Sequence, residues 1–364
     1  MANRFTVSFR VVDRASNAFR RIARSTQEIE RSSKNASAQF ANMAQVTLAT
    51  TGAMVAGFTS AAAAAGEVED ALARLQTVTR GTAEQIENSL NSAKSAALAF
   101  STEFTASSRE LVDAQFQIAT AGVAVEEQIA ATQGAFKLAV ATQGTFAQST
   151  QLLGSLLNTF GKAAEFNYLD PARKVEAITD KLSLAVQRFQ VTLPVLAESL
   201  KFVIGPASTL GLKFAEVTAS LGVLNTAGFR GSLAGTALSN MFNKLDRAVD
   251  MLNLDTSKFV DLNGNLKDMA SFLEEVERGI AGMTSIEQQN KLIEVFDIRA
   301  GRVVKTLLNQ VGAIRKNTLE MELNRGATQK MANLQQNTLS AATQKASNAL
   351  IILRLRWAIR FRLY

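Results

Sequence analysis

The sequence predicts an all-α protein, a multi-helix bundle core with long extended N- and C-terminal helices and one short β-hairpin. Alanine, leucine and glutamine are abundant among its 364 residues, and all three favour helices. The three prolines, Pro171, Pro194 and Pro206, fall in one central stretch, so both arms of the chain lack the strongest helix breaker. Because 47% of the residues are apolar, the chain can bury a sizeable core.

Residues 1–66 are predicted to form a basic N-terminal helical arm that ends in an uncharged, alanine-rich helix. Residues 1–34 carry a net charge of +5. The weak alternation of Phe5–Val12 predicts a short strand. Asp13–Val46 has only a narrow apolar stripe, which is typical of an exposed helix or a coiled coil.

The uncharged part of this arm, residues 35–66, contains the stretch Met43–Ala65, which is long enough to span a bilayer. Most of its residues are alanine, threonine and glycine, which are only weakly apolar. We therefore favour a helix that packs on another helix through small residues, with membrane insertion as the alternative.

Residues 67–311 are predicted to form a core helical domain, because several helix starts are recognisable. Thr82–Gln85, Ser107–Glu110 and Ser285–Gln288 fit the capping box, in which a hydroxyl and a side chain three residues later bond each other's backbone N–H. Asp170 precedes Pro171, which predicts an N-cap with proline at the first helical position. Phe259–Leu266 alternates around an Asn-Gly pair and predicts the hairpin.

Residues 312–364 are predicted to form a long polar C-terminal helix followed by an arginine-alternating tail. In Leu353–Leu363, large apolar residues alternate with arginines or alanine, and a period of two predicts a strand. We interpret this tail either as an interfacial membrane segment or as a truncated terminus.

The composition excludes several classes of function. Without cysteine or histidine, the chain has no disulfides, no thiolate or imidazole metal site and no Ser-His or Cys-His pair. We therefore expect no enzymatic activity, no catalytic residues, no metal and no cofactor. The net charge of +7 is concentrated at the two ends, so we expect no specific nucleic-acid partner for the central part.

Two glycine-rich segments invite comparison with phosphate sites. Gly154–Ala163 differs from a phosphate-binding loop in its spacing and lacks the hydroxyl residue that reaches magnesium. Gly228, Gly231 and Gly235 precede a predicted helix start, where backbone N–H groups can bind an anion. Their spacing equally allows two helices to approach closely, which is the interpretation we favour.

Those three glycines belong to Ala227–Leu238, the most distinctive segment of the chain. It reads Ala-Gly, an aromatic residue, a basic residue, Gly-Ser, and then Ala-Gly-Thr-Ala-Leu at the start of a helix. This order resembles the signature of the core region of bacteriophage tail tape measure proteins. The positions that match are Ala227, Gly228, Gly231, Ser232, Ala234, Gly235, Thr236, Ala237 and Leu238.

Flanking blocks extend the resemblance over about residues 67–311. Three flanking segments are similar to sequence blocks of that family: Phe104–Gly122, the Thr179–Leu182 helix and Leu193–Pro206. Phe296–Ala300 is similar to its closing Phe-Gly-x-Arg-Ala block, with Asp297 where the family usually has glycine.

The resemblance implies a structural virion protein. Several copies would lie in the lumen of the tail tube, help to set tail length, support tail assembly and leave before the genome is ejected. The implied partners are the tail tube protein, tail assembly chaperones, baseplate or tail tip proteins, further copies of the chain and the host membrane. Assembly would take place in the host bacterial cytoplasm. The alternative hypothesis is a membrane-active helical protein, pore-forming or secreted, suggested by the uncharged stretch and the arginine-alternating tail.

Overall fold

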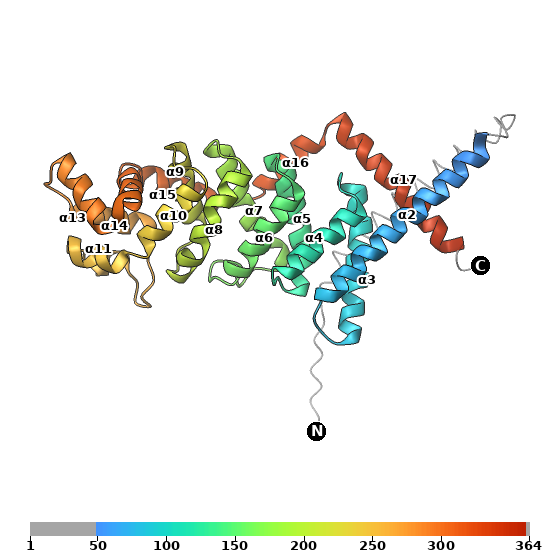
Figure 1. Cartoon of the computed structure of the whole chain (residues 1–364), viewed down its shortest axis with the longest axis horizontal. Coiled ribbons are helices and arrows are strands. Elements are labelled where there is room, and N and C mark those ends of the chain that lie inside the picture. The colour runs from blue at the N-terminus through green and yellow to red at the C-terminus, as the bar shows by residue number, and fades with distance from the viewer. Residues whose placement is uncertain (1–48, 362–364) are drawn as a thin grey trace, which may run out of the picture. The chain divides into compact units, whose positions relative to one another are not determined.

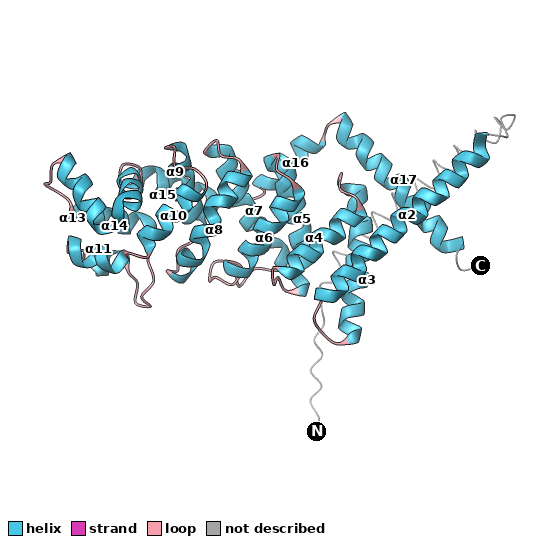
Figure 2. Ribbon diagram, in the orientation of Figure 1, coloured by secondary structure: helices cyan, strands magenta, loops and turns pink. Residues whose placement is uncertain are grey.

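The computed structural model describes residues 49–361, and these are almost entirely helical (Figures 1 and 2). The predicted all-α class is confirmed, because no β-strand occurs in this range. The strand expected at Phe5–Val12, the helix expected at Asp13–Val46 and the first residues of Met43–Ala65 lie outside the described residues.

Most helices follow one another with short connections, and the longer connections precede α7 and α13. Their bounds are α2 Ala49–Val78, α3 Ala83–Glu103, α4 Ser108–Thr120, α5 Val125–Thr142, α6 Phe146–Thr159, α7 Pro171–Arg188, α8 Leu193–Thr209, α9 Phe214–Thr226, α10 Ser232–Phe242, α11 Leu245–Leu252, α12 Thr256–Phe259, α13 Met269–Gly279, α14 Ser285–Leu308, α15 Val311–Leu323, α16 Ala327–Gln336 and α17 Leu339–Phe361.

The chain divides into two compact units. One comprises Met1–Gly66 with Ala349–Tyr364, and the other comprises Glu67–Asn348. Of the first unit, the described parts are the beginning of α2 and the end of α17. The second unit contains the helices discussed below. The domain boundaries expected from the sequence stay a prediction.

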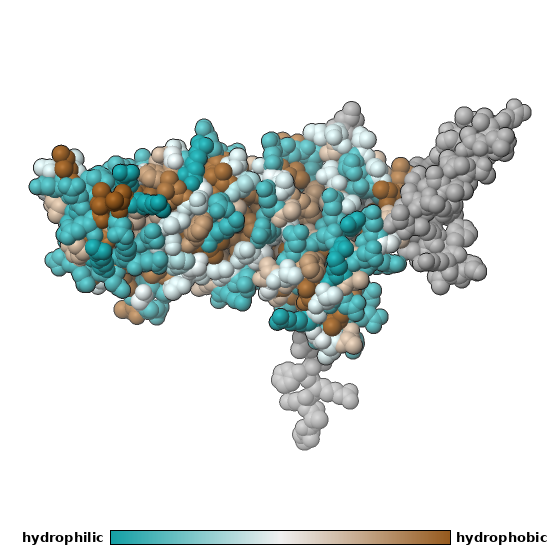
Figure 3. All heavy atoms as spheres, in the orientation of Figure 1, coloured by the Kyte–Doolittle hydropathy of each residue, from teal (hydrophilic) through white to brown (hydrophobic). Residues whose placement is uncertain are grey.

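The second unit has two apolar clusters. The main core extends from Ile118 in α4 to Met321 in α15, and a smaller cluster joins α2, α3, α4 and α5. Phe136 lies in the smaller cluster with its ring centroid 4.7 Å from that of Phe104, an aromatic contact that adds to the area buried. On the face shown in Figure 3, apolar spots are scattered among polar residues.

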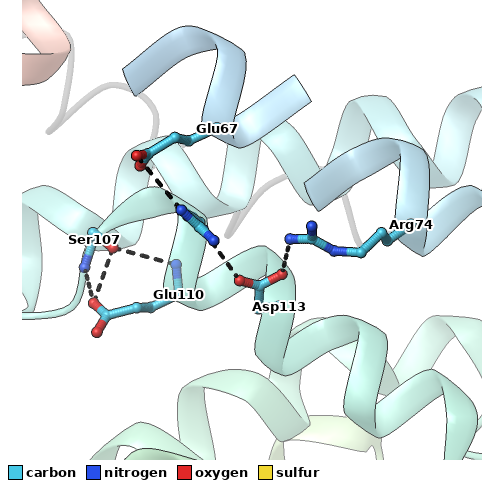
Figure 4. A network of polar contacts seen from close by, with 6 residues as sticks. Glu67, Arg74, Ser107, Glu110 and Asp113 are labelled. Atoms are coloured by element: carbon cyan, nitrogen blue, oxygen red, sulfur yellow. Dashed lines mark hydrogen bonds and ion pairs between the residues drawn. The ribbon is translucent and has the colours of Figure 1, made fainter. Parts of the chain in front are cut away.

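Capping boxes start several of these helices where the sequence predicts them. At α4, Ser107 Oγ accepts from Glu110 N at 3.3 Å, while Glu110 Oε2 accepts from Ser107 N at 2.8 Å (Figure 4). The Thr82–Gln85 box of α3 and the Asp170 cap of α7 are also confirmed. The box predicted at Ser285–Gln288 is wrong by one residue, because Thr284 and Glu287 form it.

Ion pairs join the end of α2 to α4. Arg74 lies 2.6 Å from Asp113, and Glu67 lies 3.5 Å from Arg109 (Figure 4). These side chains are partly exposed, so each pair contributes little free energy and mainly fixes which faces of the two helices meet.

After α13 the chain returns along helices that it formed earlier. The segment α14 packs on α10, α15 packs on α9 and α7, and α16 packs on α5 and α7. We call α15 and α16 the return segment. Few of its residues are buried: Ile314 and Met321 in α15, and Thr328 and Ala332 in α16.

A carboxylate fixes the junction between α15 and α16 in the return segment. Asp180, buried in α7, accepts from Gly326 N at 2.6 Å and from Thr328 N at 2.8 Å. These backbone groups lie at the N-terminus of α16, where four N–H groups lack an intrahelical acceptor and where negative charge is favourable. Ser183 adds a hydroxyl contact of 2.9 Å to Thr328. Residues almost 150 positions apart are thus joined by one helix cap.

The predicted β-hairpin at Phe259–Leu266 is wrong. Phe259 ends the short helix α12, and only an isolated bridge joins Val260 to Leu266. The two hydrogen bonds of this bridge are formed, since Lys267 N donates to Phe259 O and Asp261 N donates to Asn265 O, both at 2.8 Å. The pairing goes no further, because Phe259 belongs to α12 and Asp261 Oδ1 accepts from the backbone N–H of Asn263 and Asn265 within the turn.

Two expectations for the C-terminal part are also wrong. The polar segment after residue 311 is not one long helix, because it breaks at Asn324–Gly326 and again at Asn337–Thr338. The alternating tail is helical through Phe361 rather than a strand, and residues 362–364 lie outside the described range. A strand needs a neighbouring strand for its backbone hydrogen bonds, whereas a helix forms them internally.

None of the described helices has the length and apolar character needed to cross a membrane. The membrane-active alternative stays a prediction.

A sharp break divides α14 at Asp297, where φ is 66° and ψ is 170°. Beyond it the helix turns back, since a Cβ at Gly301 would lie 2.8 Å from the carbonyl oxygen of Leu292. This backbone conformation is nearly restricted to glycine, so aspartate is strained there. Asp297 forms an ion pair with Lys244, but 67% of its side chain is exposed, and the pair offsets only part of that strain.

Replacing Asp297 with glycine should therefore stabilise the protein. We expect Asp297→Gly to raise the free energy of unfolding by about 1–2 kcal/mol, measured by urea denaturation. Asp297→Asn is the matched control, because it removes the ion pair and keeps the strained backbone; it should be neutral or slightly destabilising. Equal effects of the two substitutions would show that Asp297 carries no backbone strain.

Candidate functional site

The resemblance noted above centres on Ala227–Leu238, which we call the signature segment. It begins at the end of α9. Gly228 N donates to Asn225 O at 3.1 Å, and Phe229 N donates to Leu224 O at 2.9 Å. With Ala227 as C-cap and Gly228 at a φ of 95°, these two bonds form a Schellman motif, which terminates the helix.

The next glycine makes the turn into α10. Gly231 has φ 57° and ψ −132°, and Leu233 N donates to Arg230 O at 3.3 Å. These angles and this bond define a type II′ turn, which places glycine at its first central position. Ser199 Oγ in α8 donates to Gly231 O at 2.9 Å and fastens the turn to the neighbouring helix.

The third glycine brings two helix backbones into contact. A Cβ built on Gly235 would lie 2.1 Å from the carbonyl oxygen of Ser199 and 3.0 Å from its Cα. Because the obstacle is backbone, no side-chain rotation could make room. Only glycine therefore permits the observed packing of α10 on α8.

The other signature positions divide between core and surface. Ala234, Ala237 and Leu238 are buried in the main core, Thr236 is half-buried, and Ser232 is exposed. The N–H groups of Leu233 and Gly235 are already used by Arg230 and Gly231. This geometry supports the interpretation of close helix packing rather than anion binding. Gly154 likewise lies inside α6, where a Cβ would meet Ala121 at 2.9 Å.

The helix that leads into the signature segment, α9, is buried on all sides. Every residue from Phe214 to Asn225 is buried, and α7, α8, α10, α14 and α15 all pack on it. The N-terminal end of such a helix needs buried acceptors. Glu165, from the connection before α7, supplies one, since its Oε1 accepts from Phe214 N at 2.7 Å.

Charged side chains gather around this end of α9, and we call them the charged layer. It consists of Glu165, Asp180, Lys181, Lys213, Glu216 and Glu322. Lys213 and Glu322 form an ion pair of 2.9 Å between the start of α9 and the return segment. Lys181 Nζ lies 5.3 Å from the centroid of the Phe166 ring, a cation–π contact.

Burial alters the acidity of this layer. It raises the pKa of Glu165 and lowers that of Lys181, because a low-dielectric surrounding disfavours the charged form of both groups. The largest change is at Glu216, whose pKa rises to about 7 through burial, with the negative charge of Asp268 adding to the effect. The fold brings Glu216, on α9, close enough to Asp268, which precedes α13, for the two charges to interact.

Two pockets adjoin the charged layer. One, of about 670 Å³, lies between α7 and the return segment, and Glu165, Lys181 and Arg325 are among its lining residues. The other, of about 270 Å³, is lined by residues of α9, α13 and α15. No group of three or more acidic residues in the described part of the chain could hold a metal ion.

Sequence reasoning missed the charged layer. Its one usable signal was Glu216, a carboxylate inside the otherwise uncharged run Phe214–Thr226, which is apolar enough to be a fully buried helix. Glu165, Lys213 and Glu322 come from three other parts of the chain, and no local pattern marks them.

Adding a single methyl group at Gly235 should disturb the contact between α8 and α10. We expect Gly235→Ala to lower the free energy of unfolding by about 1–3 kcal/mol, because the two backbones must move apart. Gly312→Ala is the control, since its Cβ would meet nothing within 4 Å; it should be neutral or slightly stabilising. Urea denaturation of both variants tests this. A Gly235→Ala variant with the same free energy of unfolding as the wild type would contradict the close contact.

Glu216 should make stability depend on pH. Its folded pKa lies above the unfolded value, so its ionisation costs stability as pH rises from about 4.5 to about 7, and the full penalty persists above. We expect Glu216→Gln to be more stable than the wild type by about 1–3 kcal/mol near pH 8 and by much less near pH 5. Urea denaturation at the two pH values measures the difference. If the difference in stability between Glu216→Gln and the wild type is the same at both pH values, the raised pKa of Glu216 is refuted.

The chain is similar to curated proteins of two phages. It is 26% identical over 300 residues to a tape measure protein of Pneumococcus phage Dp-1, covering 80% of this chain and 25% of that protein. It is 24% identical over 242 residues to a probable tape measure protein of Escherichia phage P2, covering 64% of this chain and 29% of that protein. The chain thus spans only about a quarter of the length of these relatives. No solved structure matches it.

The family described as phage-related minor tail protein matches residues 94–297, which is more than half of the chain and includes the whole signature segment. The resemblance noticed in the sequence is confirmed by this match and by the two tape measure relatives. The chain belongs to the phage-related minor tail protein family.

Proposed function

We propose that the chain acts as a phage tail tape measure protein, or as the folded part of one. It would be a non-enzymatic component of the virion that lies in the lumen of the tail tube, helps to set tail length, supports tail assembly and is released before genome ejection. The observation that carries this proposal is the family match across the signature segment, whose glycines form a helix stop, a turn and a helix contact.

The fold bears on how such a protein could act as a ruler. A continuous helix of 364 residues would extend about 550 Å at 1.5 Å per residue. The described helices instead fold back on one another, so this part of the chain contributes far less length than its residue count. In our proposal it supports assembly as a folded unit, and extended helical segments provide the length.

The proposed partners follow from this role. They are the tail tube protein, tail assembly chaperones, baseplate or tail tip proteins and further copies of the same chain. Assembly would occur in the cytoplasm of the host bacterium.

Mutant tails test the proposal. In a phage that depends on this gene, we expect Gly235→Val to abolish tails or greatly reduce their number, because the folded unit fails, while Gly312→Ala leaves them normal. We expect mass spectrometry to find the protein in intact virions and to find it depleted from particles after genome release. Tail number and length are measured by electron microscopy.

Two outcomes would contradict the proposal. One is the absence of the protein from purified intact virions. The other is normal tails in an in-frame deletion of the whole gene.

A further inference from the structure

A polar pocket between α3, α4 and α5, which we call the amide groove, has features of a binding site. Helix α3 packs on α4, and α4 packs on α5, so α4 lies between the other two helices (Figure 1). The groove has a volume of about 570 Å³. It is lined by one face of α3, by a residue in the middle of α4 and by the first turns of α5.

Two nearly buried glutamines of the groove have unused polar atoms. Gln115 on α4 and Gln128 on α5 both line it, and each is only 4% exposed. The Gln115 side chain makes no hydrogen bond within the described part of the chain. Gln128 uses its Nε2, which donates to Val123 O at 3.1 Å, and leaves its Oε1 without a donor.

These unused atoms are accessible. Seven buried side-chain atoms of the described chain are closed to solvent and lack a partner, and none of them belongs to Gln115 or Gln128. The two amide atoms of Gln115 and the Oε1 of Gln128 therefore keep some accessible surface, although the rest of each side chain is covered. A ligand in the groove can reach them without any movement of the core.

The α3 side of the groove adds further donors and acceptors. Asn88, Ser89 and Ser92 line it from one face of the helix, because residues three or four apart are neighbours on a helix surface. Their side chains make no hydrogen bond to other described residues. These three groups are therefore available to a ligand as well.

The charges of the groove favour a neutral ligand. Arg80 and Glu126 are the two charged residues among those that line it, so their charges cancel. On the α5 side, Val125 and Ile129 add aliphatic surface, and Val125 is 38% exposed. The lining thus combines amides, hydroxyls and a small apolar area, with no excess of either charge.

An extended peptide matches this combination. A glutamine amide carries two donors and an acceptor in one plane, and the N–H and C=O of one residue in an extended chain point to the same side. Successive side chains of an extended chain point to opposite faces, so backbone hydrogen bonds supply affinity while pockets for the side chains supply specificity. A sugar is the other neutral ligand rich in polar groups, but no aromatic ring lines the groove for a sugar to stack on.

We propose that the amide groove binds an extended, uncharged segment of a protein partner. Gln115 and Gln128 bond to the backbone of the segment, and an aliphatic side chain of the segment lies on Val125 and Ile129. The site stands independently of the role proposed for the chain in the tail.

Calorimetric titration of the full chain with acetyl-Thr-Val-Thr-Val-Thr-amide tests the groove. Both ends of this peptide are blocked, so it carries no charge, and its β-branched residues favour an extended backbone. We expect saturable one-to-one binding with a Kd of about 1 mM or below. The same peptide with every backbone nitrogen methylated cannot donate from its backbone and should bind at least about tenfold more weakly.

Variants show whether the peptide occupies the groove. Gln115→Met should weaken binding about tenfold, because methionine has a similar length but no amide, and the chain should stay folded because Gln115 makes no internal hydrogen bond. Ile129→Ala should weaken binding several-fold. Gln117→Met is the matched control, since it makes the same change at an exposed residue of α4 outside the groove, and it should bind as the wild type does. Circular dichroism checks that each variant is folded.

Three results would overturn the proposal. They are the absence of saturable binding of the peptide, the same affinity in folded Gln115→Met as in the wild type, and binding of maltotriose as tight as that of the peptide, which would assign the groove to a sugar.

Discussion

The direct contact between the backbones of α8 and α10 is the constraint on which the main core depends. At Gly235 no side chain separates the two helices, and the carbonyl oxygen of Ser199 occupies the place of a Cβ. Interiors are packed as densely as crystals, so a contact this close fixes the distance between the helices and the rotation of each about its axis. The stop at Gly228 and the turn at Gly231 then determine where α10 begins relative to α9. Three glycines in eight residues therefore set the positions of three consecutive helices.

That arrangement leaves α9 enclosed and creates an electrostatic problem at its N-terminus. Helix ends expose N–H groups that need acceptors, and burial removes water as the acceptor. The chain meets this need with carboxylates from elsewhere, because Glu165 accepts from Phe214 N, and Asp180 does the same for α16. Bringing acids into the core carries a cost, visible in the raised pKa of Glu165 and of Glu216. The presence of Glu165 in the charged layer is thus a consequence of burying the N-terminus of α9.

The sequence predicted the parts of this structure that local chemistry determines. The all-α class, the capping boxes at Thr82 and Ser107 and the start of α7 at Asp170 follow from residue types a few positions apart. The two wrong predictions, the hairpin and the strand in the tail, both came from an apolar alternation with a period of two. The turn after Phe259 looked like a hairpin because the apolar alternation is real, but the pairing stops after one bridge, since Phe259 belongs to helix α12. The tail after residue 352 has the period of a strand, and nothing in a sequence shows whether a second strand is available to pair with it.

The position of the return segment lay beyond sequence reasoning for a different physical reason. The burial of α9 can be predicted because this helix has apolar residues on every face, whereas α16 buries only Thr328 and Ala332. The Asp180 carboxylate fixes the start of α16, and the cap joins residues almost 150 positions apart. A single hydrogen-bonded acid leaves no periodic trace in either segment. An apolar core can be inferred from a pattern because many residues contribute to it. A polar contact between distant helices rests on two or three atoms, and it becomes visible only once the fold has brought them together.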